Sequence, residues 1–285
     1  YGDHRDLHYP LRRQRQMCIR DRYITGAGVS SDSGIPTFRG ADGFWTIGSE
    51  NYTPQEMATR YMYLNNPEQF LLWYFKRFAK YRNAEPNDVH RWLANKNLIT
   101  QNIDGLDGKA GNRNYIPIHG RLDKVTVFAE EGKDSLIIDA PWEKISRLGF
   151  THDNDPKSDD SLIKTLLEYF KIEKDKQQKY HPTLGYSLKP FVLLFDEIYT
   201  DLYRISEAQQ RMIKANKMVF MGTSFSVNIT AIALRIAASN SIDIEIIDPN
   251  PIDIGYKHAA YFLSLIHISE PTRQEAISYA VFCLK

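Results

Sequence analysis

The chain has 285 residues, of which 42% are hydrophobic and 25% charged, with a formal net charge of +1. This length is enough for one sizeable hydrophobic core, with or without a smaller second module. A nearly neutral chain gives no electrostatic reason to expect a nucleic acid or a membrane surface as partner. No apolar run approaches the roughly 20 residues of a membrane span, and no secretory hydrophobic region is visible, so we expect a cytoplasmic protein.

The two ends of the chain differ from the rest. The segments LRRQRQMCIRDR (11–22) and SLIHISEPTRQEAISYAVFCLK (264–285) carry no turn signal, helix cap or sustained period that joins them to their neighbours. Both resemble translated sequencing-adapter sequence. We therefore predict non-native tails at 1–22 and 264–285 and exclude them from fold reasoning. The alternative is a genuine basic N-terminal arm and a genuine C-terminal helix.

Both cysteines, Cys18 and Cys283, lie in these tails. Residues 23–263 therefore offer no disulfide, no thiolate metal ligand and no cysteine nucleophile. The tails also hold eight Lys and Arg against five Asp and Glu, out of totals of 36 and 35, so the remainder is close to neutral.

The first predicted element is a short strand at Tyr23 and Ile24, followed by the glycine-rich segment TGAGVSSDSGIPTFRG (25–40). Glycines at the end of a strand let backbone N–H groups approach a diphosphate, and the N-terminus of a following helix adds a favourable dipole. The spacing is G-x-G-x5-G rather than the G-x-G-x-x-G of dehydrogenases, so the loop alone does not identify its ligand.

An aromatic-rich helical insertion is predicted at 51–95, with Pro67 suited to the first turn of a helix over 67–75. Within it, Tyr74 and Arg77 form Y-x-x-R, a spacing that puts both side chains on one helix face. An arginine fork matches a carboxylate group, and a neighbouring tyrosine would strengthen such a pair. The alternative is an ordinary aromatic helix with a solvated arginine.

The next predicted strand, 97–100, leads into TQNIDGL (100–106), and the apolar run IPI (116–118) precedes His119. Imidazole suits general-base catalysis because its ordinary pKa lies near working pH. The alternative is a core histidine with a structural role. The position after an apolar run and before a glycine favours the base.

A second and smaller insertion is predicted at 123–188. It contains a charged loop around 153–160, followed by a helix over 161–179 whose apolar face carries Leu162, Leu166, Leu167 and Phe170. Its candidate metal ligands are His152 and His181 with Asp153 and Asp155. Their spacing fits no common zinc geometry, so we predict no metal.

The remaining predicted strands are 191–195, 218–221 and 242–247, each short, apolar and followed by polar or glycine residues. Such positions are where parallel sheets hold their ligands. Strands that alternate with helical patterns predict an α/β fold, a Rossmann-like parallel sheet with helices on both faces. We assign its core to 23–50, 96–122 and 189–263, with the smaller inserted module beside it.

Several of these segments together resemble the sirtuin family of NAD-dependent protein-lysine deacylases. They are similar in order to its GAGxSxxSGIPxFRG (26–40), TQNIDGL (100–106), HG (119–120), RPxVVxFGE (189–197) and GTSxxV (222–227) elements. The matches span nearly all of 23–263, which the resemblance identifies as a catalytic domain. It implies NAD as cofactor, an acylated-lysine protein or peptide as partner, and release of nicotinamide and an O-acyl-ADP-ribose.

The resemblance also implies roles for individual residues. His119 is the expected general base on a ribose hydroxyl, and Asn102 is expected to orient the ribose. The expected cofactor-binding residues are Gly26, Ala27, Gly28, Ser30, Phe38, Arg39, Gln101, Ile103, Asp104, Gly222, Thr223, Ser224 and Asp248. The expected substrate residues are Tyr74, Arg77, Phe195 and Glu197.

Tyr74 and Arg77 resemble the pair by which one sirtuin class, class III, binds acidic acyl groups such as succinyl and malonyl. The segment 37–45 is similar to bacterial members of that class. The two C-x-x-C pairs that form the zinc site in most sirtuins have no counterpart between 120 and 189. The resemblance therefore implies a member that lacks the zinc module.

Three aspartates depart from the family pattern. Asp107 replaces the histidine that commonly follows NIDGL, Asp196 replaces the glycine of FGE, and Asp248 stands where an asparagine is usual. These changes bear on substrate choice more than on NAD binding. An NAD glycohydrolase or ADP-ribosyltransferase on the same fold is the alternative enzyme, and a non-catalytic nucleotide-binding module is the third hypothesis.

Overall fold

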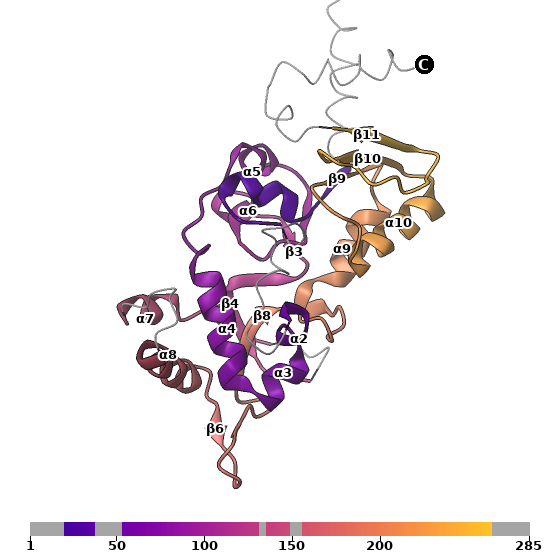
Figure 1. The fold of residues 1–285 in the computed structure, drawn as a ribbon. Coiled ribbons are helices and arrows are strands. Elements are labelled where there is room, and N and C mark those ends of the chain that lie inside the picture. Colours follow the sequence, from indigo (N-terminus) through magenta and orange to yellow (C-terminus); the bar gives the residue numbers. More distant parts are fainter. Residues whose placement is uncertain (1–19, 38–52, 131–134, 149–155, 264–285) are drawn as a thin grey trace, which may run out of the picture.

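The computed structural model describes residues 20–37, 53–130, 135–148 and 156–263, which form a larger and a smaller part (Figure 1). Phe38 and Arg39, two predicted cofactor residues, lie outside these ranges, as do all of the C-terminal tail and most of the N-terminal one. Within the described residues, no helix combines the length and apolar character needed to cross a membrane.

The larger part is built on a six-stranded parallel sheet. Its strands are β1 (Asp21–Thr25), β2 (Leu98–Thr100), β3 (Ile116–Pro117), β9 (Lys217–Met221), β10 (Asp243–Ile247) and β11 (Ala259–Phe262). Their order in the sheet is β11-β10-β9-β1-β2-β3. The strand order therefore reverses between β1 and β9, which is the switch point where doubly wound sheets bind dinucleotides. The predicted α/β Rossmann-like fold is confirmed.

Helices cover both faces of this sheet because successive strand residues point to opposite sides. On one face, Ile24 and Phe220 pack with α9 (Ile205–Ile213) and α10 (Asn228–Asn240). On the other, Tyr23 and Val219 pack with α5 (Asp88–Leu93). The buried strands are nearly continuous apolar runs, as expected for a sheet covered on both sides.

The strand β1 begins two residues before the predicted boundary at Tyr23. Asp21 and Arg22 pair with Lys217 and Met218 of β9 in the same parallel register as the rest of the strand. The sheet thus includes two residues that the sequence analysis assigned to the N-terminal tail.

The smaller part combines the first predicted insertion, apart from α5, with the second insertion around one core. Its antiparallel sheet has the order β5-β4-β8, with β4 at Gly120–Val127, β5 at Ile137–Asp139 and β8 at Leu188–Val192. Helices α2 (Pro54–Met57), α3 (Arg60–Asn65), α4 (Pro67–Ala79), α7 (Trp142–Arg147) and α8 (Pro156–Tyr169) surround it. The Phe75 ring of α4 meets Phe170, which directly follows α8, in this core, with the ring centroids 5.6 Å apart.

Two predicted elements need correction. The strand predicted at 191–195 for the parallel sheet is β8, which pairs antiparallel with β4 in the smaller sheet. The helix predicted over 161–179 is α8 and ends at Tyr169, because Lys171 turns the chain with φ of 54°. A two-stranded ribbon follows, formed by β6 (Glu173–Lys174) and β7 (Tyr180–His181). An apolar run cannot reveal which sheet its strand will join.

The predicted apolar face of that helix is confirmed. Its members are all buried in the core of the smaller part, three of them on α8 and Phe170 directly after the helix ends: Leu162, Leu166, Leu167 and Phe170.

Candidate active site

Two glycine-containing loops meet at the switch point. The N–H of Gly26 donates to Met221 O at 3.0 Å, and that of Gly28 donates to Gly222 O at 2.9 Å. A Cβ on Gly28 would lie 2.7 Å from Gly222 Cα, so a larger residue would push the loops apart. We expected both glycine amides to face a diphosphate. Both instead donate within the protein, so these glycines serve the contact between the loops.

The segment after Gly26 is a 3-10 helix, η1 (Ala27–Ser33), and not an α-helix. Ala27 is its first residue, and Gly34 ends it with φ of 78°. Gly222 also has a positive φ, 57°, a backbone conformation that residues other than glycine rarely adopt. The short helix turns Ser30 toward the carboxyl ends of the strands.

Ser30, Asn102 and Asp104 form a hydrogen-bonded cluster beside β1 and β2. Ser30 Oγ donates to Asp104 Oδ2 at 2.7 Å, and Asn102 Nδ2 donates to Ser30 Oγ at 3.0 Å and to Gly26 O at 3.1 Å. The N–H of Leu106 donates to Asp104 Oδ1 at 2.9 Å. Ser30 and Asn102 are buried, whereas Asp104 is partly exposed. The cluster therefore holds an oriented carboxylate at the edge of the sheet.

His90 joins this cluster and was missed by sequence reasoning. It lies on α5, where its Nδ1 is 2.8 Å from Asn87 Oδ1 and its Nε2 is 3.4 Å from Ser30 Oγ. Burial lowers the pKa of His90, while the charge of Asp104 opposes that shift. The signal in the sequence is weak, because N-x-x-H is an ordinary capping arrangement in which Asn87 begins the helix.

Gln101 connects the nucleotide loops to the predicted base. Its Nε2 donates to Thr223 Oγ1 at 3.1 Å, and its backbone oxygen lies 2.8 Å from His119 Nδ1. A carbonyl oxygen only accepts, so Nδ1 carries the proton of the neutral ring and Nε2 is the acceptor. Burial lowers the pKa of His119 to about 4, and the hydrogen bond to Gln101 opposes the shift. The imidazole is therefore neutral near pH 7.

His119 lies where the chain passes from one sheet to the other, since β3 ends at Pro117 and β4 begins at Gly120. The N–H of Leu193 donates to His119 O at 2.9 Å. Gly120 has φ of 86°, and a Cβ there would lie 2.0 Å from Phe191 O. The glycine of the His-Gly pair is required because the neighbouring strand passes directly against its Cα.

The other predicted cofactor residues lie around the same edge. Ile103 O accepts from the N–H of Leu122 at 2.8 Å, and Ser224 is exposed with its hydroxyl 2.6 Å from that of Ser226. Asp248 directly follows β10 and accepts from the N–H of Asn250 at 2.8 Å. The hydrogen bond from Gly222 N to Ile247 O, 3.1 Å, brings Asp248 beside the second glycine loop.

The segment after β8 is tied to the start of α3. Phe195 is 55% exposed, and its N–H donates to Ala58 O at 3.0 Å. The Asp196 carboxylate accepts from the N–H of Arg60 at 2.6 Å and of Tyr61 at 2.9 Å. It thus binds two of the N–H groups that a helix start leaves without partners. Asp196 has no positive φ, so this backbone does not require the family's glycine.

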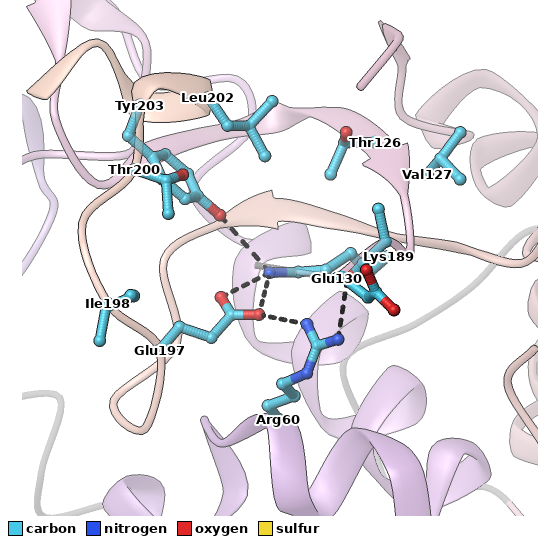
Figure 2. A pocket seen from close by; sticks show the side chains of 11 residues that line it. Arg60, Thr126, Val127, Glu130, Lys189, Glu197, Ile198, Thr200, Leu202 and Tyr203 are labelled. Atoms are coloured by element: carbon cyan, nitrogen blue, oxygen red, sulfur yellow. Dashed lines mark hydrogen bonds and ion pairs between the residues drawn. The ribbon is translucent and has the colours of Figure 1, made fainter. Parts of the chain in front are cut away.

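Glu197 lies in a buried ion cluster, shown in Figure 2. Lys189 Nζ donates to both of its carboxylate oxygens, at 2.7 and 2.6 Å, and Arg60 donates at 3.1 Å. The side chain of Glu197 is only 4% exposed. It was predicted to contact substrate. Its carboxylate instead fixes the loop, with a further hydrogen bond from the N–H of Leu194 at 3.0 Å.

Tyr74 and Arg77 lie on α4, facing the core of the smaller part. The Tyr74 ring packs on Phe78 with centroids 4.7 Å apart, and the Arg77 guanidinium lies 5.9 Å from the Trp73 ring. The Tyr74 hydroxyl is buried and has no hydrogen-bond partner among the described residues. Burial raises the pKa of Tyr74 and lowers the pKa of Arg77. A polar atom buried in this way is satisfied only if a ligand or water reaches it.

Metal binding was not expected, and this stays a prediction. Within the described residues, no three His, Cys, Asp or Glu side chains are grouped closely enough to hold a metal ion.

Comparison with known proteins identifies relatives of this chain. Residues 26–229 match the sequence profile of the Sir2 family. The NAD-dependent protein deacylase 1 of Archaeoglobus fulgidus is 46% identical over 106 residues, and the NAD-dependent protein deacylase of Thermus thermophilus is 38% identical over 122. These alignments cover 35% and 39% of this chain, and 42% and 46% of the relatives. The chain thus matches less than half the length of each.

Solved structures are similar over nearly the whole chain. A complex of a Sir2 homologue with NAD has a TM-score of 0.63 at 27% identity, covering 100% of this chain and 97% of that one. A histidine-to-asparagine variant of a Sir2 homologue in complex with ADP-ribose has a TM-score of 0.64 at 26% identity. That match covers 96% of this chain and 98% of the other.

Proposed function

The chain belongs to the Sir2 family, and on this basis we propose that it is an NAD-dependent protein-lysine deacylase. It would release nicotinamide and an O-acyl-ADP-ribose, with an acylated-lysine protein or peptide as its partner. One observation carries the proposal. The glycine loops, the Ser30–Asn102–Asp104 cluster and the His119 imidazole are joined by hydrogen bonds at the switch point of the sheet.

The residues at this edge suit NAD. The Asp104 carboxylate, oriented by Ser30, can accept from the nicotinamide carboxamide, and Asn102 can orient the ribose. Thr223, Ser224 and Asp248 would face the adenosine side. NAD supplies a ribosyl carbon whose bond to nicotinamide breaks with a cationic leaving group, so neither a metal nor a hydride acceptor is needed. Two relatives carry NAD-dependent deacylase names, and one similar structure is an NAD complex.

The base is assigned to His119 Nε2. Because Nδ1 is hydrogen-bonded to Gln101 O, the ring holds a fixed tautomer with its acceptor nitrogen available for a ribose hydroxyl. The hydrogen bond at Nδ1 also restrains the ring, so less reorientation is needed when Nε2 takes the proton. The proposed step is removal of that hydroxyl proton by Nε2.

An NAD glycohydrolase or ADP-ribosyltransferase is the second candidate. The observation that favours it lies in the segment after β8, which in the proposed deacylase adds the substrate peptide as a strand. The Phe195 N–H is already bonded to Ala58, and Asp196 is bonded to the start of α3. A segment held in this way has fewer backbone groups available for hydrogen bonds to a substrate peptide.

An assay separates the two candidates. The full chain is incubated with NAD and with acetyl-, succinyl- and malonyl-lysine peptides, and nicotinamide and deacylated peptide are measured. The proposed deacylase predicts nicotinamide release that requires peptide and equals the deacylated product. Equal release without peptide would establish the glycohydrolase, and no release from NAD under any condition would leave a non-catalytic nucleotide-binding module.

The acyl preference is proposed to be acidic, as in the class III-like, zinc-module-lacking members of the family. The support is the buried Tyr74 hydroxyl without a described partner and the Arg77 guanidinium three residues later on the same helix. A carboxylate on the acyl chain would satisfy the first and neutralise the second. The aromatic core shared by α4 and α8 would order the smaller part without zinc.

A further inference from the structure

Tyr199 contacts the proposed base and was not among the residues predicted from the sequence. It lies between β8 and the 3-10 helix η3 (Asp201–Tyr203). Its hydroxyl oxygen is 2.8 Å from His119 Nε2, and the two rings are nearly parallel, with centroids 5.8 Å apart and an interplanar angle of 28°. The Tyr199 ring is partly buried against the core that contains α10.

The direction of this hydrogen bond follows from its neighbours. Gln101 O can only accept, so in the neutral ring the proton sits on His119 Nδ1 and Nε2 has only its lone pair. Tyr199 must therefore donate. The backbone N–H of Ile229, in the first turn of α10, lowers the pKa of Tyr199, opposing the larger effect of burial. The result is a chain of hydrogen bonds from Tyr199 through His119 to Gln101.

The Tyr199 hydroxyl and a ribose hydroxyl would both have to donate to one acceptor, His119 Nε2. An imidazole nitrogen has a single lone pair, and Tyr199 occupies the one that a ribose hydroxyl must use. We infer that Tyr199 is a positioning residue that acts through His119, its hydroxyl holding the base nitrogen in the free enzyme until the ribose hydroxyl takes its place. The second half of this inference rests on the proposed deacylase function.

Tyr199 neither gives nor takes a proton in this transfer. The ribose O–H bond breaks and its electron pair stays on the ribose oxygen, which becomes the nucleophile. The proton forms a bond to Nε2 while Nδ1–H stays hydrogen-bonded to Gln101 O, so the ring becomes a cation. The Tyr199 hydroxyl turns away and keeps its proton, as expected because burial raises the pKa of Tyr199 to about 12. Within the described part of the chain, no carboxylate or cationic side chain forms an ion pair with His119, so Tyr199 is the titratable side chain that faces it.

The substitution Tyr199→Phe removes the hydroxyl and keeps the ring. The first measurement is a ¹⁵N and ¹³C NMR titration of the His119 ring in the ligand-free full chain, which does not depend on turnover. A donor to Nε2 stabilises the neutral ring, so its loss should raise the His119 pKa by about 0.5–1 unit, since a neutral hydrogen bond contributes about 0.5–1.5 kcal/mol. The wild type should show the Nδ1–H tautomer.

The second measurement is kcat/KM for NAD at saturating acyl peptide. Removing the competing donor should raise kcat/KM by about 2- to 10-fold. The base must be neutral to act, so the acid limb of the pH profile should move to higher pH along with the His119 pKa. Tyr256→Phe is the matched control, because its hydroxyl bonds Ala237 O and Ile242 O near the other end of α10.

The two measurements can fail separately. Unchanged His119 resonances in Tyr199→Phe, or an Nε2–H tautomer in the wild type, would overturn the contact itself. A fall in kcat/KM with a shifted His119 pKa would overturn the competition and make Tyr199 a support of the active base. If the wild type shows no peptide-dependent turnover, the deacylase proposal fails, while the NMR titration still decides whether Tyr199 holds the base nitrogen.

Discussion

The two parts of the molecule build their polar sites by different means. In the larger part, short side chains such as Ser30, Asn102 and Thr223 lie at strand ends and bond one another and the backbone of two glycine loops. In the smaller part, an apolar core of aromatic and aliphatic side chains lies beside a buried ion cluster at Lys189 and Glu197. The first arrangement orients polar groups at the edge of the parallel sheet, whereas the second holds a loop in place.

The difference suggests a division of tasks, with His119 at the boundary. The larger part orients the groups that would act on NAD, and the smaller part carries the residues that would distinguish acyl groups and peptides. His119 is bonded to both, through Gln101 O on one side and the N–H of Leu193 on the other. Three substitutions test this division.

The largest effect is expected from His119→Ala. Loss of a general base typically costs about 10²–10⁴ in rate, so peptide-dependent nicotinamide release should fall by at least about 10². Thermal unfolding and NAD binding should change little, because among the described residues the ring bonds Gln101 O and the Tyr199 hydroxyl alone. His181→Ala, at an exposed ribbon position, is the matched control. Deacylation at the wild-type rate would remove His119 from the reaction.

The second effect is on stability and concerns Glu197→Gln. Removing one member of a buried ion pair leaves a buried charge without compensation, which costs about 3–5 kcal/mol. Burial already lowers the pKa of Lys189, so the variant should favour a neutral lysine and lose free energy of unfolding most at low pH, where the lysine must be charged.

Denaturant unfolding at pH 6 and pH 9 measures the effect of Glu197→Gln. Glu143→Gln is the control, because Glu143 pairs with Arg147 at side-chain exposures of 81% and 75% and should lose almost nothing. Equal unfolding free energies for the two variants would show that the ion cluster does not hold the smaller part together.

The smallest effect is selective and concerns Arg77→Met. A charge-assisted hydrogen bond contributes about 1.5–3 kcal/mol, so kcat/KM for succinyl-lysine peptide should fall roughly 10- to 100-fold while that for acetyl-lysine stays within about twofold. Arg91→Met, an exposed arginine on α5, serves as control. A parallel loss for both peptides would mean that Arg77 supports the fold and does not select the acyl group.

Much of the proposed NAD site was predictable because its residues lie in short segments that directly follow strands. The loop from Gly26 to Ser30, the segment from Gln101 to Asp104, and His119 each follow a strand, and the carboxyl ends of parallel strands meet at one edge. Their convergence is confirmed by the hydrogen bonds that join them. The use of the Gly26 and Gly28 amides was not predictable, because it depends on how closely the loop at Gly222 approaches.

The contacts missed by sequence reasoning are long-range. Tyr199 reaches His119 across 80 positions, and His90 reaches Ser30 across 60. Neither residue lies in a sequence motif that predicts a role in the site. The strand β8 was assigned to the wrong sheet for a related reason, since an apolar strand fits either a parallel or an antiparallel neighbour until its partner is known.

Local sequence patterns were enough to establish the α/β class, the order of the motifs and the residue types that carry the chemistry. These are recorded in short stretches through periodicity, glycine spacing and polar residues at strand ends. The folded packing set which groups are already bonded. The Tyr199 hydroxyl is hydrogen-bonded to His119 Nε2, Asp196 caps α3, and Glu197 is buried with Lys189. Hydrogen bonds and ion pairs depend on distances of a few ångströms between residues far apart in the chain, and only the folded packing sets those distances.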